Sequence, residues 1–253
     1  MICIFAVIRG LLYPLAGTVI GSALVFFTKR NPTKRFMTVL DSLAGGIMCA
    51  ASFFSLIRPA VEQAENHSVF SMLSCSAGFF SGLIVFILIN KITEKVLSEK
   101  NKSGNMMFFA VTVHNIPEGM AVGVVFAGIL TGREDVSIAS ALTLSLGIAM
   151  QNIPEGAIIA LPQNMRGKSR QRAFLYGVFS GLAELFAGIV TLSAATLVYG
   201  ILPFSLCFAA GAMFYVVLSE LSEGFTDKKN SVVSLISFDS GFIIMMLLDT
   251  MLG

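Results

Sequence analysis

Apolar runs of about 20 residues follow one another along the whole chain, and short clusters of charged residues separate them. A helix of that length crosses the hydrocarbon core of a bilayer, which is about 30 Å thick. Only 13% of the 253 residues are charged, against about 25% in an ordinary soluble domain. We therefore predict an all-α integral membrane protein, with a single transmembrane domain over residues 1–253.

Eight of these runs are long enough to span a membrane as helices. The first is about 25 residues long and no A-x-A-like cleavage site follows it, so we interpret it as a spanning helix and not as a signal peptide. The predicted spans are residues 4–28, 37–57, 69–91, 106–130, 137–162, 173–199, 203–222 and 232–252.

Basic residues accumulate in alternate loops. Most of the 17 lysines and arginines follow the first, third, fifth and seventh spans. Cytoplasmic loops are enriched in Lys and Arg, so these loops are predicted to be cytoplasmic and both termini extracytoplasmic, in a multi-pass protein of the cell (inner) membrane. We interpret the basic runs, "MRGKSRQR" among them, as solvated anchors and not as lipid-recognition sites, and we expect no nucleic-acid partner.

The pentapeptide NIPEG occurs twice, at residues 115–119 and 152–156, in two successive spans. Successive spans run in opposite directions, so the repeat implies an approximate two-fold axis in the membrane plane, as in many secondary transporters. A fainter similarity between "AGGIMCAASFFS" in the second span and "AAGAMFYVVLSE" in the seventh favours the same symmetry. We predict an inverted repeat of spans one to three and six to eight around the central fourth and fifth spans.

The proline of each motif removes a backbone donor inside its helix and frees the carbonyl oxygen four residues earlier. The freed oxygens are those of Val113 and Met150. In lipid such groups need partners inside the protein or in a wet cavity. The prolines therefore indicate either a packing kink or a polar site, and the surrounding residues favour the site.

Polar side chains surround both prolines at spacings of three and four residues, which place them on one face of each helix. Facing lipid they would be costly, so they must face one another or water. Three of them are carboxylates with no Lys or Arg at the same depth, so they are either protonated or hold cations. The residues around the prolines are His114, Asn115 and Glu118 in the fourth span and Gln151, Asn152 and Glu155 in the fifth. Glu184, near the centre of the sixth span, is the third carboxylate.

The residue types narrow the choice of cation. Imidazole beside carboxylates suits Zn²⁺, Fe²⁺ or Mn²⁺, whereas carboxylates and waters satisfy Mg²⁺. His114 is one of only two histidines in the chain. Met48 in the second span could add a soft thioether, but as one of 13 methionines it is by itself interpreted as a packing residue.

The motifs "HNIPEG" and "QNIPEG", with "AGGIMCAASFFSLIRPA" and "GLAELFAG", resemble the ZIP (Zrt-, Irt-like protein) family of divalent-metal transporters, in its prokaryotic GufA-like branch. The resemblance implies two adjacent metals bridged by Glu118 and Glu155. Many relatives have His in place of Gln151, and binuclear relatives have Asp in place of Asn152, so a single occupied site is an open alternative. The implied ligands are His114, Gln151 and Met48 for the first metal, and Asn115, Asn152 and Glu184 for the second.

The resemblance also implies ATP-independent uptake of Zn²⁺ into the cytoplasm, often by a homodimer, with Fe²⁺, Mn²⁺ and Cd²⁺ as further candidate substrates and no cofactor. The chain contains no G-x-x-x-x-G-K-[ST] loop for nucleotide. A proton- or sodium-coupled carrier of another solute is an alternative. An intramembrane metallohydrolase is a second, but the chain lacks H-E-x-x-H, so we predict that it is not an enzyme. Metal preference, proton coupling and the roles of Glu220 and Asp239 stay open.

Overall fold

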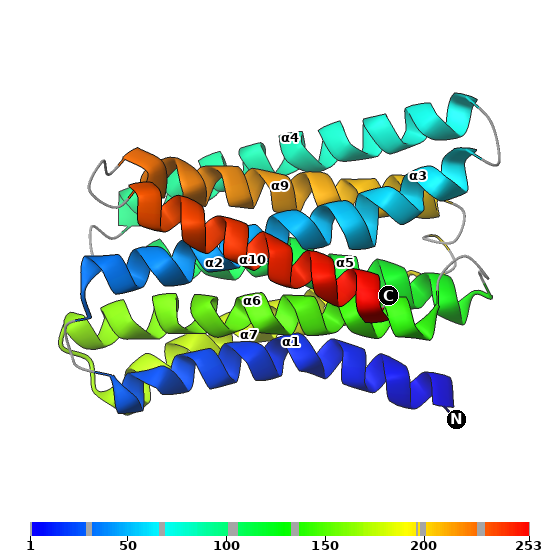
Figure 1. The fold of residues 1–253 in the computed structure, drawn as a ribbon. Coiled ribbons are helices and arrows are strands. Elements are labelled where there is room, and N and C mark those ends of the chain that lie inside the picture. The colour runs from blue at the N-terminus through cyan, green and yellow to red at the C-terminus, as the bar shows by residue number, and fades with distance from the viewer. Residues whose placement is uncertain are drawn as a thin grey trace.

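The computed structural model describes residues 2–28, 32–65, 69–100, 106–132, 137–195, 197, 201–226 and 231–252. Within these ranges every regular element is helical and no strand occurs. The helices lie side by side along one common direction (Figure 1). The prediction of an all-α protein is confirmed.

Each predicted span coincides with one helix, except that the second is made of three consecutive helical pieces. Its middle piece is a π-helical segment. The elements are α1 (Ile2–Phe27), α2 (Lys34–Ala51), η1 (Ser52–Ile57), α3 (Arg58–Glu65), α4 (Val69–Lys100), α5 (Met106–Leu130), α6 (Ile138–Met165), α7 (Arg170–Ser193), α9 (Leu202–Thr226) and α10 (Ser231–Leu252).

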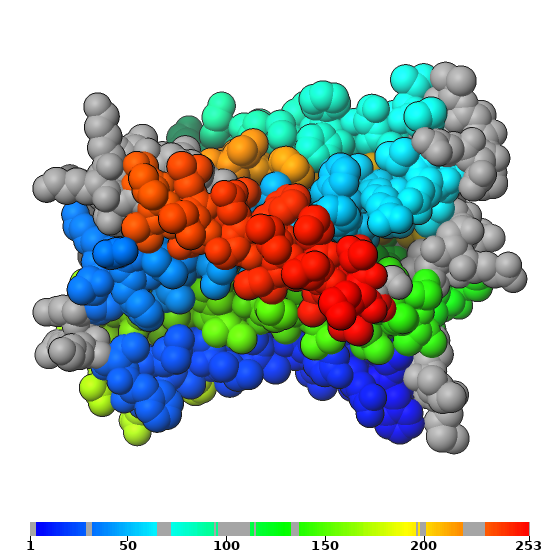
Figure 2. Space-filling view, in the orientation of Figure 1, coloured from blue at the N-terminus to red at the C-terminus, as the bar shows by residue number. Residues whose placement is uncertain are grey.

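In the part of the chain that the structure describes, seven helices are long and apolar enough to cross a membrane. The remaining long helix, α5, has 25 residues, of which Asn115–Leu130 forms a shorter apolar stretch. Large apolar side chains point outward from several helices, including Phe186 and Val190 of α7, which are 65% and 68% exposed. Figure 2 shows α10, in red, lying across one outer face of the bundle. Helices with apolar outer faces are those of a multi-pass membrane protein.

Four helix pairs carry most of the packing: α1 with α6, α5 with α7, α4 with α9, and α2 with α10. The glycines of the two NIPEG motifs lie at two of these contacts. A Cβ at Gly119 in α5 would overlap the backbone oxygen of Glu184 in α7, and a Cβ at Gly156 in α6 would overlap that of Thr18 in α1. Each motif glycine therefore permits a neighbouring helix to approach closely, as small residues do in membrane proteins.

Hydrogen bonds that involve side chains link helices within two groups. In the first group, which holds the motifs, they connect α1, α5, α6 and α7, as described below. In the second group, Ser42 of α2 bonds Ser234 of α10 at 2.6 Å, and Asn90 of α4 donates to Tyr215 of α9 at 2.9 Å. By contrast, apolar side chains line contacts between the groups, for example where Met245 of α10 lies against Gly147 of α6.

Candidate metal-binding site

Both motif prolines lie inside continuous helices. Pro117 is internal to α5 and Pro154 is internal to α6. Each helix retains its assignment on both sides of its proline, so neither motif breaks its helix into separate halves. The polar residues around the prolines are consequently presented from regular helix faces.

The two motif helices are joined by a bond between an amide and a carboxylate. The side-chain nitrogen of Gln151 in α6 donates to Oε1 of Glu118 in α5 at 2.7 Å. Both side chains are fully buried. A hydrogen bond to a carboxylate is stronger than one between neutral groups, so this contact fixes the two side chains relative to each other.

A second amide connects α6 to two further helices. The nitrogen of Asn152 donates to Oε2 of Glu184 in α7 at 2.7 Å, and to the backbone oxygen of Pro14 in α1 at 3.1 Å. Asn152 is completely buried and Glu184 is 2% exposed. The carboxylate of Glu155 is close enough to interact electrostatically with Glu184. Two carboxylates near each other in a buried site repel unless a proton or a cation lies between them.

The third amide is oriented by α7. The nitrogen of Asn115 in α5 donates to the backbone oxygen of Ser180 at 3.2 Å and to its hydroxyl oxygen at 3.3 Å. The hydroxyl of Thr112 also reaches the Ser180 hydroxyl, at 3.4 Å. The oxygen Oδ1 of the same amide has no hydrogen-bond partner among the described residues.

All three amides use their nitrogen in these contacts, and their oxygens are left over. In the described part of the chain, the buried oxygens of these residues without a hydrogen-bond partner include Oδ1 of Asn115, Oε1 of Gln151, Oδ1 of Asn152 and Oε1 of Glu184. Every one of these atoms is an acceptor. A buried acceptor without a donor costs about 1–3 kcal/mol, and a group of several is rare in a native interior. A cation stabilises such a group, because amide and carboxylate oxygens are ligands for divalent metals.

Six of the predicted site residues lie in the interior of the bundle, and hydrogen bonds join four of them in two pairs, Gln151 with Glu118 and Asn152 with Glu184. Asn115, Glu118, Gln151, Asn152, Glu155 and Glu184 are all buried, each at most 7% exposed. The backbone of His114 is part of α5, but its side chain lies outside the described residues, as does that of Glu220. Asp239 is exposed on α10.

Met48 is completely buried in α2, in an apolar cluster with Val216 and Val217 of α9. These apolar surroundings agree with the interpretation of Met48, from the sequence alone, as a packing residue. Among the described side chains, no three His, Cys, Asp or Glu residues form a metal-binding group by themselves. A metal at this position would need the amide oxygens in addition to the carboxylates.

Two contributors could not be identified from the sequence. Ser180 orients Asn115, and the backbone oxygen of Pro14 orients Asn152. Pro14 is a proline inside α1, which was a possible signal, but nothing in the sequence pairs it with Asn152. Ser180 lies one turn before Glu184 in "FSGLAE", and a serine inside a helix can equally bond the backbone of its own preceding turn.

Comparison with known proteins finds zinc transporters. The Zip family profile, described as ZIP Zinc transporter, matches residues 95–249. The zinc transporter ZIPB of Bordetella bronchiseptica is 31% identical, over 94% of this chain and 78% of its own length. The zinc transporter GufA of Myxococcus xanthus is 30% identical, over 94% and 96%. The human zinc transporter ZIP11 is 27% identical, over 99% and 98%.

Proposed function

Because this chain belongs to the ZIP family of zinc transporters, we propose that it moves Zn²⁺ through the membrane into the cytoplasm without ATP, at the buried polar site between α5, α6 and α7. The named relatives are zinc transporters, which are not enzymes. The observation that carries the proposal is the group of buried amide and carboxylate oxygens without donors. An arrangement of acceptors alone fits a cation and opposes an anionic solute.

In the proposed site the carboxylate oxygens of Glu118 and Glu155 replace water ligands of the metal, and their negative charge balances its positive charge. His114 and Gln151 complete a first position, which the thioether of Met48 would join only by leaving its apolar cluster with Val216 and Val217. Asn115, Asn152 and Glu184 complete a second. Carboxylate, amide and imidazole donors together suit Zn²⁺, and also Fe²⁺, Mn²⁺ and Cd²⁺. The metal is substrate here, so its release matters as much as its capture. Amide oxygens, being neutral, hold it less tightly than carboxylates would.

The residues around the site prepare it for the cation. Ser180 and Pro14 occupy the nitrogens of Asn115 and Asn152, so the amide oxygens need no rotation when a metal arrives. Partners that orient metal ligands in this way typically contribute about 10- to 100-fold in metal affinity. In the case of Gln151 the nitrogen is held by Glu118 itself, so binding of a metal to that carboxylate oxygen competes with the hydrogen bond.

We propose that the protein alternates access by moving α1, α5, α6 and α7 against α2, α4, α9 and α10. Side-chain hydrogen bonds join helices within each group, whereas apolar contacts such as Met245 on Gly147 lie between them. Apolar surfaces can slide without breaking hydrogen bonds. The helix pairing also supports the inverted repeat: exchanging α1 with α7, α2 with α9, α4 with α10 and α5 with α6 converts the α1–α6 contact into α7–α5, and α2–α10 into α9–α4.

The proposal places the protein in the cell membrane with both termini extracytoplasmic, and a homodimer is its proposed assembly. The basic loops support this orientation. In this proposal, Zn²⁺ on the extracytoplasmic side moves into the cytoplasm without any nucleotide.

Uptake of Zn²⁺, Fe²⁺ and Mn²⁺ into proteoliposomes, with and without a pH gradient, tests the function. Glu118→Ala should lower Zn²⁺ uptake to the level of empty liposomes, because it removes a charge that no amide can supply. Glu62→Ala is the matched control and should transport normally, since Glu62 is an exposed carboxylate of α3, away from the polar site, and bonds Arg58 on the same helix at 2.8 Å. Both variants should be inserted in equal amounts. Normal Zn²⁺ flux through a correctly inserted Glu118→Ala protein would overturn the site.

A further inference from the structure

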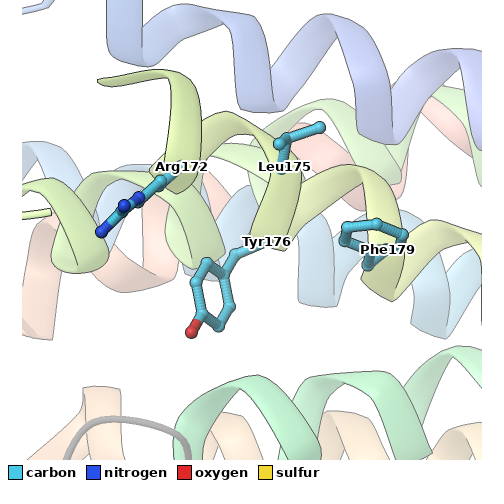
Figure 3. A pocket seen from close by; sticks show the side chains of 4 residues that line it. All are labelled: Arg172, Leu175, Tyr176 and Phe179. Carbon is cyan, nitrogen blue, oxygen red and sulfur yellow. The ribbon is translucent and has the colours of Figure 1, made fainter. Parts of the chain in front are cut away.

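A groove outside the polar site runs along the first half of α7. It is a cavity of about 550 Å³ whose described walls are Arg172, Leu175, Tyr176 and Phe179. These residues share one face of the helix, at spacings of three and four. Figure 3 shows Tyr176 extending from α7 into the open space, with Arg172 one turn before it. Leu175 and Phe179 are 46% and 58% exposed, so their apolar surface is not covered by the chain.

The positive charge at one end of this groove has no carboxylate to balance it among the described lining residues. Arg172 is exposed at the start of α7. The ammonium of Lys168, a residue just before α7, lies 3.5 Å from the centroid of the Tyr176 ring, so a second cation lies against a lining residue of the groove. No Asp or Glu occurs between Glu155 and Glu184 in the sequence. The groove is therefore cationic at its mouth and apolar along its length.

The direction of the groove relative to the membrane decides what can fill it. The whole of α7, from Arg170, is a candidate membrane span. Phe179 lies about 10 Å beyond Arg172 along the helix axis, at about 1.5 Å per residue. The cationic mouth is thus at the membrane interface, and the apolar walls reach into the hydrocarbon.

A ligand for this groove must carry a negative group at the interface and an apolar chain below it. A free anion leaves the walls of Leu175 and Phe179 unused, and a neutral lipid leaves the two cations without a counter-charge. Basic pockets between membrane helices bind the headgroups of anionic lipids for these reasons. We infer that the groove of Arg172, Leu175, Tyr176 and Phe179 binds an anionic phospholipid, with its headgroup on Arg172 and Lys168 and an acyl chain along Leu175 and Phe179.

This assignment separates Arg172 from the other residues of the basic run. Arg170 of the same loop donates to the backbone oxygen of Phe26 in α1 at 3.2 Å, so its guanidinium is already bound within the protein. The sequence-based interpretation of "MRGKSRQR" as solvated anchors is retained for the run, and Arg172 with Lys168 is the exception. The groove also lies close to the proposed metal site. Phe179, which lines the groove, directly precedes Ser180 in α7, and Ser180 orients Asn115 of α5.

Lipid retention by the purified chain, measured by native mass spectrometry without added metal, tests the inference. The protein is transferred from nanodiscs of phosphatidylglycerol, or of phosphatidylcholine, into detergent. We expect one phosphatidylglycerol molecule to be retained at least several-fold more than phosphatidylcholine. Arg172→Gln should abolish this preference, and Phe179→Ala should reduce retention of the lipid. Arg170→Gln is the matched control and should keep the preference.

Thermal unfolding in detergent separates lipid binding from a folding defect and from simple anion binding. Arg172→Gln should unfold at the wild-type temperature without lipid, and only the wild-type protein should gain stability from phosphatidylglycerol. Glycerol 1-phosphate at the same concentration should give no gain. Equal loss of retention in Arg172→Gln and Arg170→Gln, equal retention of both lipids, or an equal gain from glycerol phosphate would each overturn the inference. Because no metal is present, these results do not depend on the transport proposal.

Discussion

Gln151 holds Glu118 through its amide nitrogen, at 2.7 Å, with both side chains fully buried. The bond joins the two NIPEG helices at the point where the proposed first metal would lie. It occupies one carboxylate oxygen with a donor, and a metal binding to the same oxygen must displace that donor. If the proposed ligand set is right, the residue at position 151 should therefore influence the affinity for the metal.

Gln151→His should strengthen Zn²⁺ binding. A neutral imidazole offers a nitrogen ligand of the type Zn²⁺ prefers, and it can coordinate the metal without first releasing Glu118. We expect the dissociation constant for Zn²⁺ to fall roughly tenfold, equivalent to about 1.4 kcal/mol. Titration calorimetry with the detergent-solubilised protein measures this. Gln163→His, at another buried glutamine in the same helix, should leave the affinity unchanged, and weaker binding by Gln151→His would contradict the proposed ligand set.

The motif glycines can be tested separately from metal binding. A Cβ at Gly119 would overlap the backbone oxygen of Glu184, and backbone cannot move aside as a flexible side chain can. Gly119→Ala should therefore destabilise the protein by about 1–3 kcal/mol, the usual cost of overpacking. Gly156→Ala, against Thr18, should behave alike. Thermal unfolding provides the measurement.

Gly132 provides the control for these substitutions. Its φ of +82° lies in the left-handed region, and nothing lies within 4 Å of an added Cβ. Asn tolerates a left-handed conformation better than other residues with a side chain, so Gly132→Asn should cost far less than Gly119→Ala. Equal unfolding temperatures for Gly119→Ala and the wild type would show that α5 and α7 are not closely packed there.

The sequence predicts the helices and the polar faces, because both depend on local information. Apolar length defines each span, and spacing within one helix places Asn115 with Glu118, and Asn152 with Glu155. The exact ends are less local: α4 continues to Lys100, beyond the predicted end at residue 91, since Lys and Glu are good helix formers after the apolar signal has ended.

Partners on different helices could not be predicted, because they depend on how each helix is rotated and shifted against its neighbour. Ser180 as the partner of Asn115, and Pro14 as the partner of Asn152, are of this kind. The π-helical segment Ser52–Ile57 could not be predicted either, for a different reason. A π-helical turn changes the direction of the side chains that follow it, and no propensity of single residues encodes it.

Ser180→Ala should weaken metal binding without unfolding the protein. The substitution removes the hydroxyl that accepts from Asn115 at 3.3 Å but keeps the backbone oxygen, so the amide is left with one partner and can rotate. We expect roughly tenfold weaker Zn²⁺ binding, as for other residues that orient metal ligands. Ser193→Ala, whose hydroxyl bonds its own helix at Ile189, is the control.

Two measurements on Ser180→Ala distinguish a purely structural role of Ser180 from its proposed role in orienting the Asn115 amide. The KM for Zn²⁺ uptake should rise while the maximal rate changes little, because the amide oxygen is still present when the metal concentration is high. The unfolding temperature without metal should stay near that of Ser193→Ala. A lower maximal rate at unchanged KM would contradict the positioning role.

Protons and Zn²⁺ should compete for the site. In the proposed site a metal would bind the neutral imidazole of His114 and the ionised forms of Glu118 and Glu155, so each bound proton would have to leave before or during binding. Histidine is the side chain that gains its charge between about pH 8 and 5, so Zn²⁺ affinity should fall as the pH is lowered through that range. Zinc added to the protein in weak buffer should release protons, recorded with a pH indicator, and His114→Ala should release fewer. A dissociation constant that does not change across the range of about pH 8 to 5 would contradict a site in which ionised carboxylates and an imidazole bind the metal.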